Sequence, residues 1–235
     1  TTREERFSGI ISQLKPFCDS ELRDHFFSHD EEKEIDLEKL INNPETSKYK
    51  ACVILLNTLQ FQKTAKVFGK MVLQLLAWIT SKRKMNASFC PVMIDEFSAF
   101  VFDGFEQFLN KARSKNIALH LSHQAISDLE NVSVSFAKTI NVNTNIKVLL
   151  GLNDPDTADY MARHLGTRTK QKSTERATKN NWGDVETSGD MSLREVEQYK
   201  IHPNRLKNYS NGVGVISLLI DGYPFVEEVQ FDRRA

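Results

Sequence analysis

The chain has 235 residues, of which 40% are hydrophobic, and this is enough apolar material for one large core or a core and a half. Lys plus Arg and Asp plus Glu number 31 each, so the net charge neither favours nor excludes an anionic partner. The three cysteines lack metal-ligand and CxxC spacing, which argues against a disulfide scaffold and indicates a reducing, cytoplasmic compartment.

The first part of the chain is predicted to be helical and acidic. Apolar residues recur at helical spacing from Phe7 to Phe17, and Ile35–Ile41 predicts a further short helix or turn. No apolar run approaches the ~20 residues that a transmembrane helix needs, so we expect a soluble segment. Because the first residue is Thr and not Met, we expect an excised piece whose missing parts lie upstream.

From Ala51 onward, strand patterns and helix patterns alternate. The run Ala51–Asn57 is apolar and partly β-branched, as is typical of a strand covered on both faces, and a helix is predicted over 62–83. Strands are then predicted at Cys90–Ile94 and Ile117–Leu121, with a helix at Gly104–Lys115 between them. This alternation predicts an α/β fold with a mostly parallel sheet.

Shorter elements follow this alternating region. Two short helices are expected near Ile126–Leu129 and Val134–Ala137, and strand candidates at Ile140 and Lys147–Leu150. A helix is predicted over Asp154–Leu165, because Asp154 can accept a hydrogen bond from a free amide of the first turn and Pro155 fits that turn.

The last third of the chain divides into a polar part and a hairpin. Thr167–Asp190 is rich in Lys, Thr, Ser and Asn, and we expect a long mobile loop there. Val213–Leu219, the turn Asp221-Gly222 and Phe225–Phe231 predict a C-terminal β-hairpin. The cations around the polar part are candidates for binding nucleic-acid phosphates, although such a run is more often a solvated loop: Arg163, Arg168, Lys170, Lys172, Arg176 and Lys179.

The most informative local motif is PVMIDEF at 91–97, in which an apolar strand ends in Asp95 and Glu96. Ligands of parallel α/β sheets bind at the carboxyl ends of the strands. A carboxylate there can hold magnesium, usually through water, and its neighbour can orient or deprotonate an attacking water. The alternative is structural, with Asp95 capping the next turn and Glu96 merely exposed.

Two further polar residues fit the same kind of site. Gln124 follows the strand predicted next to the Asp-Glu strand and can sense a γ-phosphate or position water. Arg113 ends the intervening helix and can reach a neighbouring subunit's phosphate. The alternatives are a helix-entry hydrogen bond for Gln124 and a favourable helix C-terminal charge for Arg113.

A phosphate-binding loop is missing from the sequence. The motif G-x-x-x-x-G-K-[ST] would cradle phosphates with backbone amides. The only Gly-Lys pair is Gly69-Lys70, which has Thr64 at the first glycine position and no Ser or Thr after the lysine. We interpret that pair as a feature of a helix.

Taken together, these stretches resemble the second half of the motor domain of type IV coupling proteins of the TraD/TraG class, the ATPases of conjugation and type IV secretion. The resemblance covers nearly the whole chain. Its carriers are PVMIDEFSAF (91–100), LNKARSKNIALHLSHQAISDL (109–129), NVNTNIKVLLGLNDPDTADYMARHLGT (141–167) and SLREVEQYKIHPNRLKNYSNGVGVI (192–216), and RFSGIISQLKPFCD (6–19) resembles the end of the family's helical insertion.

The resemblance implies a RecA-like P-loop NTPase core, with residues 1–45 ending the helical insertion domain and 46–235 forming the C-terminal part of the nucleotide-binding domain. It implies ATP and magnesium as cofactors of the complete protein, with Asp95 on the magnesium side, Glu96 as the catalytic glutamate, Arg113 as the inter-subunit arginine and Gln124 as the nucleotide-sensing glutamine. Without the phosphate-binding loop, we expect this piece alone to be inactive.

The resemblance also implies partners and a place in the cell. These are a homo-hexamer at the cytoplasmic face of the bacterial inner membrane, single-stranded DNA with bound relaxase, a relaxosome accessory protein and secretion-channel proteins. Two alternatives stay open. One is a non-catalytic module that docks relaxosome or secretion partners, and the other is a different RecA-like motor for DNA packaging or chromosome partition.

Overall fold

The computed structural model describes residues 34–179 and 185–232 and a few helical residues before them, and for 172–179 and 185–193 it describes the backbone alone. Most residues of the helices predicted over 4–30 lie outside the described part of the chain. The residues described there are all helical, and they are Ser8, Ser12, Leu14, Lys15, Phe17 and Cys18. The chain divides into two compact units, residues 1–124 with 128–143, and residues 125–127 with 144–235.

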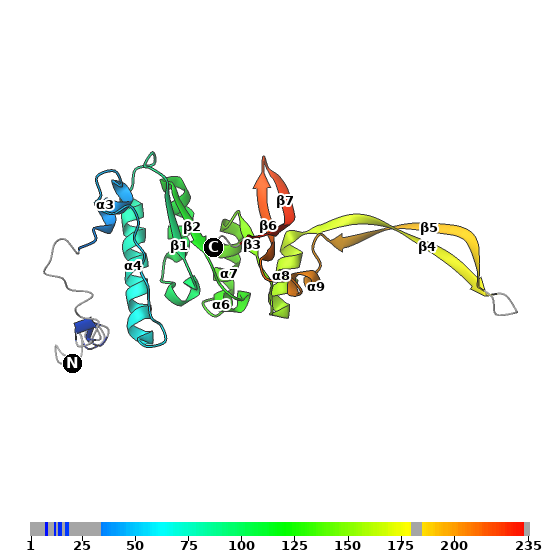
Figure 1. Cartoon of the computed structure of the whole chain (residues 1–235), viewed down its shortest axis with the longest axis horizontal. Coiled ribbons are helices and arrows are strands. Elements are labelled where there is room, and N and C mark those ends of the chain that lie inside the picture. The colour runs from blue at the N-terminus through cyan, green and yellow to red at the C-terminus, as the bar shows by residue number, and fades with distance from the viewer. Residues whose placement is uncertain are drawn as a thin grey trace. The chain divides into compact units, whose positions relative to one another are not determined.

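The first unit is built around a parallel pair of strands. β1 (Cys90–Ile94) pairs with β2 (Ile117–Leu121) in a register that runs from Cys90 opposite Ile117 to Ile94 opposite Leu121 (Figure 1). The connection between them contains the 3-10 helix η2 (Phe97–Phe100), α5 (Phe105–Ala112) and the 3-10 helix η3 (Arg113–Lys115). The strands and the intervening helix predicted from the sequence are confirmed.

Helix α4 (Gln62–Lys82), drawn in cyan in Figure 1, gives this unit its longest element. Its buried apolar side chains recur at helical spacing, because one stripe of the helix faces the core, and they are Ala65, Leu73, Leu76 and Ile79. The short helix α3 (Leu37–Asn42) begins at Asp36, whose carboxylate accepts a hydrogen bond from the Lys39 amide at 2.9 Å. Helices α3 and α4 pack against each other in the first unit.

An aromatic cluster fills the space between η2, α5 and α7 (Val134–Asn143). The rings of Phe97 and Phe105 stack with centroids 5.8 Å apart, and both rings also contact Phe136. Phe108 meets Phe105 edge-on at 5.9 Å. Such aromatic pairs stabilise beyond the area they bury, so the turn after β1 is fixed by packing.

Gly69 lies where α4 and η2 pack together, and it explains the Gly-Lys pair as a feature of a helix. A Cβ built at Gly69 would lie 2.8 Å from Cε1 of Phe100, closer than packed carbons approach. We therefore expect Gly69→Ala to destabilise the protein by about 1–3 kcal/mol, although alanine is the better helix former. Urea unfolding measures this, with the exposed Gln74→Ala on the same helix as the control. A gain in stability would show that Phe100 moves away at little cost.

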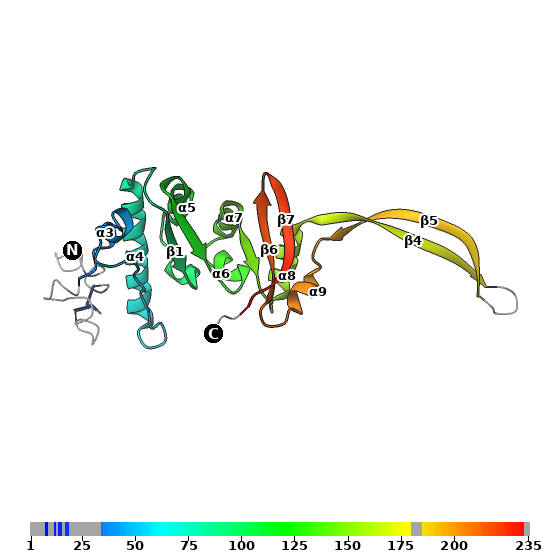
Figure 2. The same cartoon turned by 45° about the horizontal axis from the view of Figure 1, so that its top comes forward.

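The second unit holds an antiparallel sheet. Its strand order is β3 (Lys147–Leu149), β6 (Val213–Ile220) and β7 (Tyr223–Gln230), and β6 and β7 join through a turn at Asp221 and Gly222, both with positive φ (Figure 2). Helices α8 (Pro155–Leu165) and α9 (Pro203–Lys207) pack with this sheet around one apolar cluster. Its buried members are Leu149, Ala158, Met161, Ala162, Leu165, Leu206 and Val215.

The predicted start of α8 is confirmed in detail. The Asp154 carboxylate accepts hydrogen bonds from the Thr157 amide at 2.9 Å and the Thr157 hydroxyl at 2.5 Å, and Pro155 occupies the first turn. These hydrogen bonds lower the pKa of Asp154 below its usual value. Asp154 therefore stays ionised at the helix N-terminus, where a negative charge is favourable.

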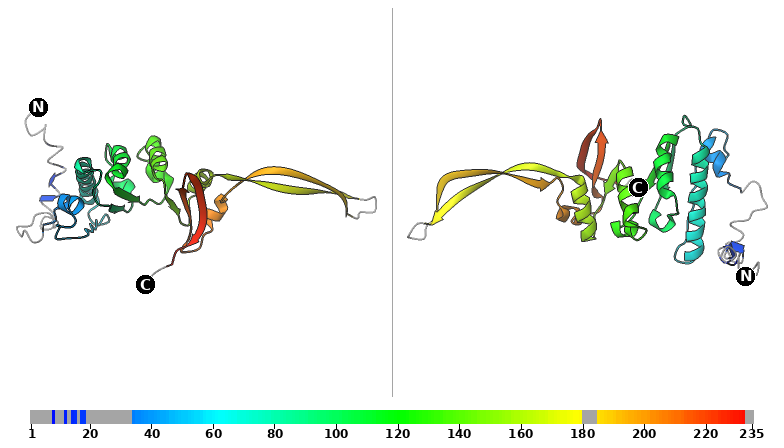
Figure 3. Two further views of the ribbon diagram at one scale, coloured as in Figure 1. Left: turned by 90° about the horizontal axis from the view of Figure 1, so that it is seen from above. Right: turned by 180° about the vertical axis from the view of Figure 1, so that it is seen from behind.

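The long polar segment that we expected to be a loop forms strands. β4 (Thr167–Lys179) and β5 (Val185–Tyr199) pair antiparallel, and Figure 3 shows them as a long twisted ribbon. The loop prediction is therefore wrong for 167–179 and 185–190, and residues 180–184 lie outside the described part of the chain. Four threonines of β4, at 167, 169, 174 and 178, favour a strand. Polar residues on both faces hide the alternation of apolar and polar side chains that reveals a half-buried strand.

Two other expectations are corrected. Ala51–Asn57 forms no strand and is irregular, with Val53 and Leu55 exposed to 79% and 89%. Ile140, a strand candidate, is a buried residue of α7. The sheet of β1 and β2 is parallel, as predicted, whereas the two other sheets of the described residues, β3-β6-β7 and β4-β5, are antiparallel. None of the helices in the described part of the chain has the length and apolarity that a membrane crossing requires.

A polar network ties α9 to β7 in the second unit. Arg205 Nε and Nη2 each donate to a carboxylate oxygen of Glu228 at 3.0 Å, and the Tyr209 hydroxyl donates to Glu228 Oε1 at 2.7 Å. These donors lower the pKa of Glu228, with the Arg205 hydrogen bonds as the largest cause. Burial, followed by the Glu228 hydrogen bond, raises the pKa of Tyr209, so its hydroxyl remains a donor across the ordinary pH range.

This network predicts a pH-dependent contribution to stability. Since the folded-state pKa of Glu228 lies below its unfolded value, its contribution is present above about pH 4.5 and disappears as pH falls through the folded-state pKa. The free energies of unfolding of the wild type and of Glu228→Gln should therefore differ above pH 5 and converge towards pH 3. Urea titrations over this range measure the difference, which is small because the pair is exposed. Glu227→Gln, an exposed neighbour, should show no such convergence.

Candidate functional site

Parallel strands bring their carboxyl ends to one edge, and the polar residues that follow β1 and β2 meet there. The pairing continues one step past the strands, because the Ser122 amide donates to the Ile94 carbonyl at 3.1 Å and the Phe97 amide donates to the Ser122 carbonyl at 3.2 Å. Asp95 follows β1 directly and Ser122 follows β2 directly. The register of the two strands therefore places these two side chains side by side.

Asp95 is held at this edge by two donors. The Ser122 hydroxyl makes a short hydrogen bond to Asp95 Oδ1, and the Glu96 amide donates to the same oxygen at 3.1 Å. Both contacts fall on Oδ1, and Asp95 is exposed. Asp95 does not cap the helix η2, because the residue before η2 is Glu96 and no side chain caps that helix.

Glu96 occupies a costly backbone conformation beside Asp95. Its φ of 47° and ψ of 42° lie in the left-handed region, which costs a non-glycine residue about 1 kcal/mol or more. The next residue, Phe97, is 0% exposed within the aromatic cluster, and this packing fixes the turn. As a result the carboxylates of Asp95 and Glu96 both face solvent at the strand ends.

Gln124 joins this group from the segment after β2. Its Nε2 donates to Glu96 Oε1 at 3.0 Å, so the amide orients the glutamate. The structure thus brings together Asp95, Glu96 and Gln124 from the sequence-predicted residues. Sequence reasoning assigned no role to Ser122, although its position one residue after β2 matches that of Asp95 after β1, and the paired strand ends are the signal that identifies it.

Arg113 lies elsewhere in the unit. It begins η3, which precedes β2 with Asn116 between them, whereas Ser122 and Gln124 follow β2. The five residues of β2 span about 16 Å, so Arg113 and the acidic residues lie at opposite ends of the strand. Within one copy of the chain, Arg113 therefore does not belong to the Asp95–Glu96 group.

The oxygens at this edge are of the kind that magnesium takes. Asp95, Glu96 and Ser122 offer carboxylate and hydroxyl oxygens, and magnesium is usually held by one or two carboxylates, waters and substrate phosphates. No cluster of three or more His, Cys, Asp or Glu side chains suited to a metal occurs among the described residues. The ring of His123 packs edge-on against the ring of Phe97, and the two ring centroids are 6.0 Å apart. The donor set therefore fits a magnesium ion that is shared with a bound phosphate.

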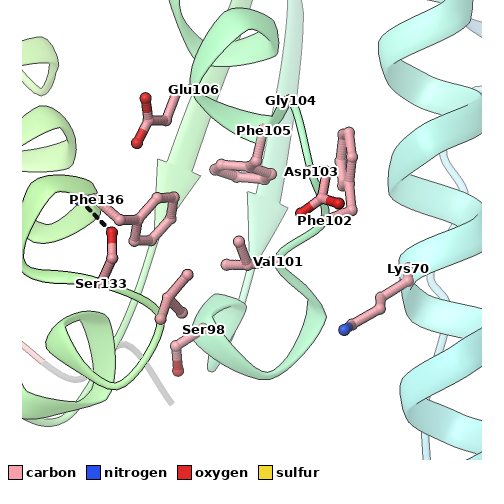
Figure 4. Close-up of a pocket in the computed structure, with 11 residues that line it drawn as sticks. Lys70, Ser98, Val101, Phe102, Asp103, Gly104, Phe105, Glu106, Ser133 and Phe136 are labelled. Carbon is pink, nitrogen blue, oxygen red and sulfur yellow. Dashed lines mark hydrogen bonds between the residues drawn. The ribbon is translucent and has the colours of Figure 1, made fainter.

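A pocket of about 470 Å³ lies next to this edge in the first unit. Figure 4 shows Lys70 of α4 directed towards it from one side and Phe105 and Phe136 from the other. Its lining includes Ser98 of η2 but not Asp95, Glu96 or Gln124. The candidate site is therefore an open acidic edge beside the pocket.

The candidate nucleic-acid contacts belong to two elements of the second unit. Arg163 is in the last turn of α8, where its Nε donates to the Asp159 carbonyl at 3.3 Å. Arg168 and Lys170 are exposed on β4, and Lys172 follows on the same strand. Arg176 and Lys179 are further along β4, where the backbone alone is described.

Comparison with known protein families gives a match for this chain. A family model described as the TraM recognition site of TraD and TraG matches residues 90–208, which is half of the chain and includes β1, β2 and the β4–β5 ribbon. No curated protein matches the chain by sequence.

Several solved structures share the fold. A trigonal form of the bacterial conjugative coupling protein TrwBdeltaN70 in complex with sulphate is similar with a TM-score of 0.64 and 14% identity, over 86% of this chain and 44% of that chain. Its unbound monoclinic form has a TM-score of 0.60 and 15% identity, over 75% and 38%. Plasmid coupling protein TrwB in complex with ADP and Mg2+ has a TM-score of 0.55 and 16% identity, over 75% and 37%. The chain spans less than half the length of each of these structures.

Proposed function

The chain belongs to the TraD/TraG family of coupling proteins, and on this basis we propose that it is the C-terminal half of an ATP-driven motor that moves DNA and protein in conjugation. The observation that carries the proposal is the meeting of Asp95, Glu96 and Gln124 where β1 and β2 end. The RecA-like core, the homo-hexamer and the place at the cytoplasmic face of the inner membrane are parts of this proposal.

Each residue of the site has a proposed task. Bound ATP would supply the phosphoanhydride to be cleaved, and magnesium would supply the positive charge that stabilises the negative charge developing on the phosphates. Asp95 would hold the magnesium ion through water. The Ser122 hydroxyl orients the Asp95 carboxylate for this task. Glu96 orients and deprotonates the attacking water. Gln124 fixes the Glu96 carboxylate by its 3.0 Å hydrogen bond and senses the nucleotide state.

Arg113 is proposed to act between subunits. An arginine that faces a neighbouring subunit can stabilise the charge that develops on the phosphoryl group. The separation of Arg113 from Asp95 and Glu96 by the length of β2 supports an action in trans and not in its own site. The residues that cradle the phosphates are proposed to lie in the complete protein, since this sequence has no G-x-x-x-x-G-K-[ST] motif.

The nucleotide is proposed from the solved relatives as well as from the chemistry. Coupling protein TrwB forms complexes with a non-hydrolysable ATP analogue and with ADP and Mg2+. The proposed cargo is single-stranded DNA with its bound relaxase, delivered to secretion-channel proteins.

A second function is favoured by one specific observation. The matching family model is described as a TraM recognition site, so this half of the protein is also a candidate for docking a relaxosome accessory protein. Such a module needs neither hydrolysis nor the Glu96 carboxylate.

Measuring DNA-stimulated ATP hydrolysis by the full-length protein tests the motor. Turnover that rises when DNA is added supports it. An absence of turnover, together with retained binding of a relaxosome protein, would replace the motor by the docking module.

A further inference from the structure

The β4–β5 ribbon separates its charges onto two faces, and we propose that its basic face binds the phosphate backbone of duplex DNA. This basic face is defined by Arg168, Lys170 and Lys172 of β4 and Arg194 of β5. The inference goes beyond the proposed function, because a motor that moves a single strand does not require a separate contact with duplex DNA.

The separation follows from the strand register. In an antiparallel pair, residues directly opposite each other share a face, and residues two apart along a strand share it too. Arg168 lies opposite Gln198, Lys170 opposite Val196 and Lys172 opposite Arg194. These six positions hold four cations and no carboxylate.

The opposite face of the same ribbon is acidic. Thr169 lies opposite Glu197 and Gln171 opposite Glu195, one residue out of phase with the cations. The ribbon is therefore not a uniformly charged, solvated arm, since its positive and negative side chains occupy different sides. A neutral overall composition hides this arrangement, which appears only when the register is known.

The cations of the basic face are available to a ligand. Arg168, Lys170 and Arg194 are exposed, and none of the three makes an ion pair or side-chain hydrogen bond with another residue that the structure describes. Arg168, Lys170 and Lys172 occupy successive positions on one face of β4, about 6.8 Å apart, and this spacing suits contacts with different phosphates. A linear array of separately placed cations is suited to a polyanion with regularly spaced charges.

The remaining residues of this face favour duplex DNA over other polyanions. Proteins that hold single strands stack the bases on aromatic side chains, and the six positions include no aromatic residue. Protein interfaces have an apolar centre, whereas Val196 is the only apolar residue among the six. A two-stranded ribbon is also narrow enough for the major groove of B-DNA, which is about 12 Å wide.

The test is the salt dependence of DNA binding by the full-length protein. If four phosphates are neutralised, the slope of log K against log [salt] should change by about 3.6 when they are lost. We expect Arg168→Gln/Lys170→Gln/Lys172→Gln/Arg194→Gln to bind a 30-base-pair duplex about 100-fold more weakly at 50 mM salt. Fluorescence anisotropy between 50 and 200 mM NaCl measures both quantities, and circular dichroism verifies that the variant is folded.

A matched variant separates this face from net charge. Lys63→Gln/Lys66→Gln/Lys111→Gln/Lys138→Gln removes the same charge from exposed positions of the first unit and should leave the slope unchanged. Equal losses in both variants, or an unaltered slope in the ribbon variant, would overturn the proposal. A loss confined to a single strand of the same sequence, or to an acidic peptide, would also overturn it and assign the face to that ligand. ATP hydrolysis without DNA should be the same in the ribbon variant and the wild type, so failure of the motor is seen separately.

Discussion

Replacing Glu96 with glutamine should lower ATP hydrolysis by the full-length protein about 100-fold or more while leaving nucleotide binding intact. The substitution keeps the size of the side chain and a group that can pair with Gln124, but it removes the carboxylate that takes a proton from the attacking water. Because Asp95 and its Ser122 hydrogen bond are untouched, the magnesium side of the site should be preserved. A coupled phosphate-release assay and titration with a fluorescent ATP analogue measure the two quantities.

Two further variants sharpen this prediction. Glu130→Gln removes another exposed carboxylate, at the end of α6 (Ile126–Glu130), and should leave hydrolysis unchanged. Gln124→Ala removes the donor that holds Glu96, so it should lower turnover by a smaller factor, about 10-fold. If Glu96→Gln hydrolyses ATP at the wild-type rate, Glu96 is not the catalytic base. This conclusion does not depend on whether the protein is a DNA motor.

The sequence predicted the parallel pair and its polar edge well for a physical reason. β1 and β2 are short apolar runs with helical periodicity between them, and this combination allows few structures other than a strand–helix–strand unit. Because the two strands are parallel, the polar residues that follow them lie at the same edge of the sheet. Only the partner of Asp95 was missed, because Ser122 as a residue type carries no chemical signal without the strand register.

The two largest errors arose where the structure depends on a partner segment. Ala51–Asn57 has the composition of a buried strand, yet a strand needs a neighbouring strand to satisfy its amides and carbonyls. None of the described strands pairs with it, so it stays irregular. In contrast, the residues of β4 and β5 have no apolar face, and each forms a strand because the other supplies its hydrogen bonds. Composition alone describes neither situation.

Arg83 is a buried charged residue of the first unit. It is 2% exposed and follows the last residue of α4. Its guanidinium donates to the carbonyls of Lys115 at 2.7 Å, Asn116 at 3.1 Å and Ile41 at 3.1 Å, and also to that of Ser88. Arg83, at the end of α4, therefore joins α3 and the starts of β1 and β2, and its partners range in sequence from Ile41 to Asn116.

The carbonyl dipoles stabilise the charge of Arg83, and no carboxylate among the described residues forms an ion pair with it. Burial lowers the pKa of Arg83, and burial raises the pKa of the nearby Cys90 thiol, which therefore remains neutral at pH 7. Each hydrogen bond from a charged donor contributes about 1.5–3 kcal/mol, and its loss leaves a buried acceptor unpaired. The carbonyl of Asn116 also accepts from the Cys90 amide at 2.9 Å, so it keeps one partner when the arginine is removed.

We therefore expect Arg83→Met to lower the free energy of unfolding by about 3–5 kcal/mol, a large part of the stability of a domain of this size. Arg83→Lys keeps the charge and can reach fewer of the carbonyls, so its loss should be intermediate. Lys84→Met removes a neighbouring exposed charge and should cost less than about 0.5 kcal/mol. Urea unfolding monitored by circular dichroism gives all three values. If the methionine variant is as stable as the wild type, packing alone holds α3, α4 and the strand starts together, and the Arg83 hydrogen bonds only replace those that water would make.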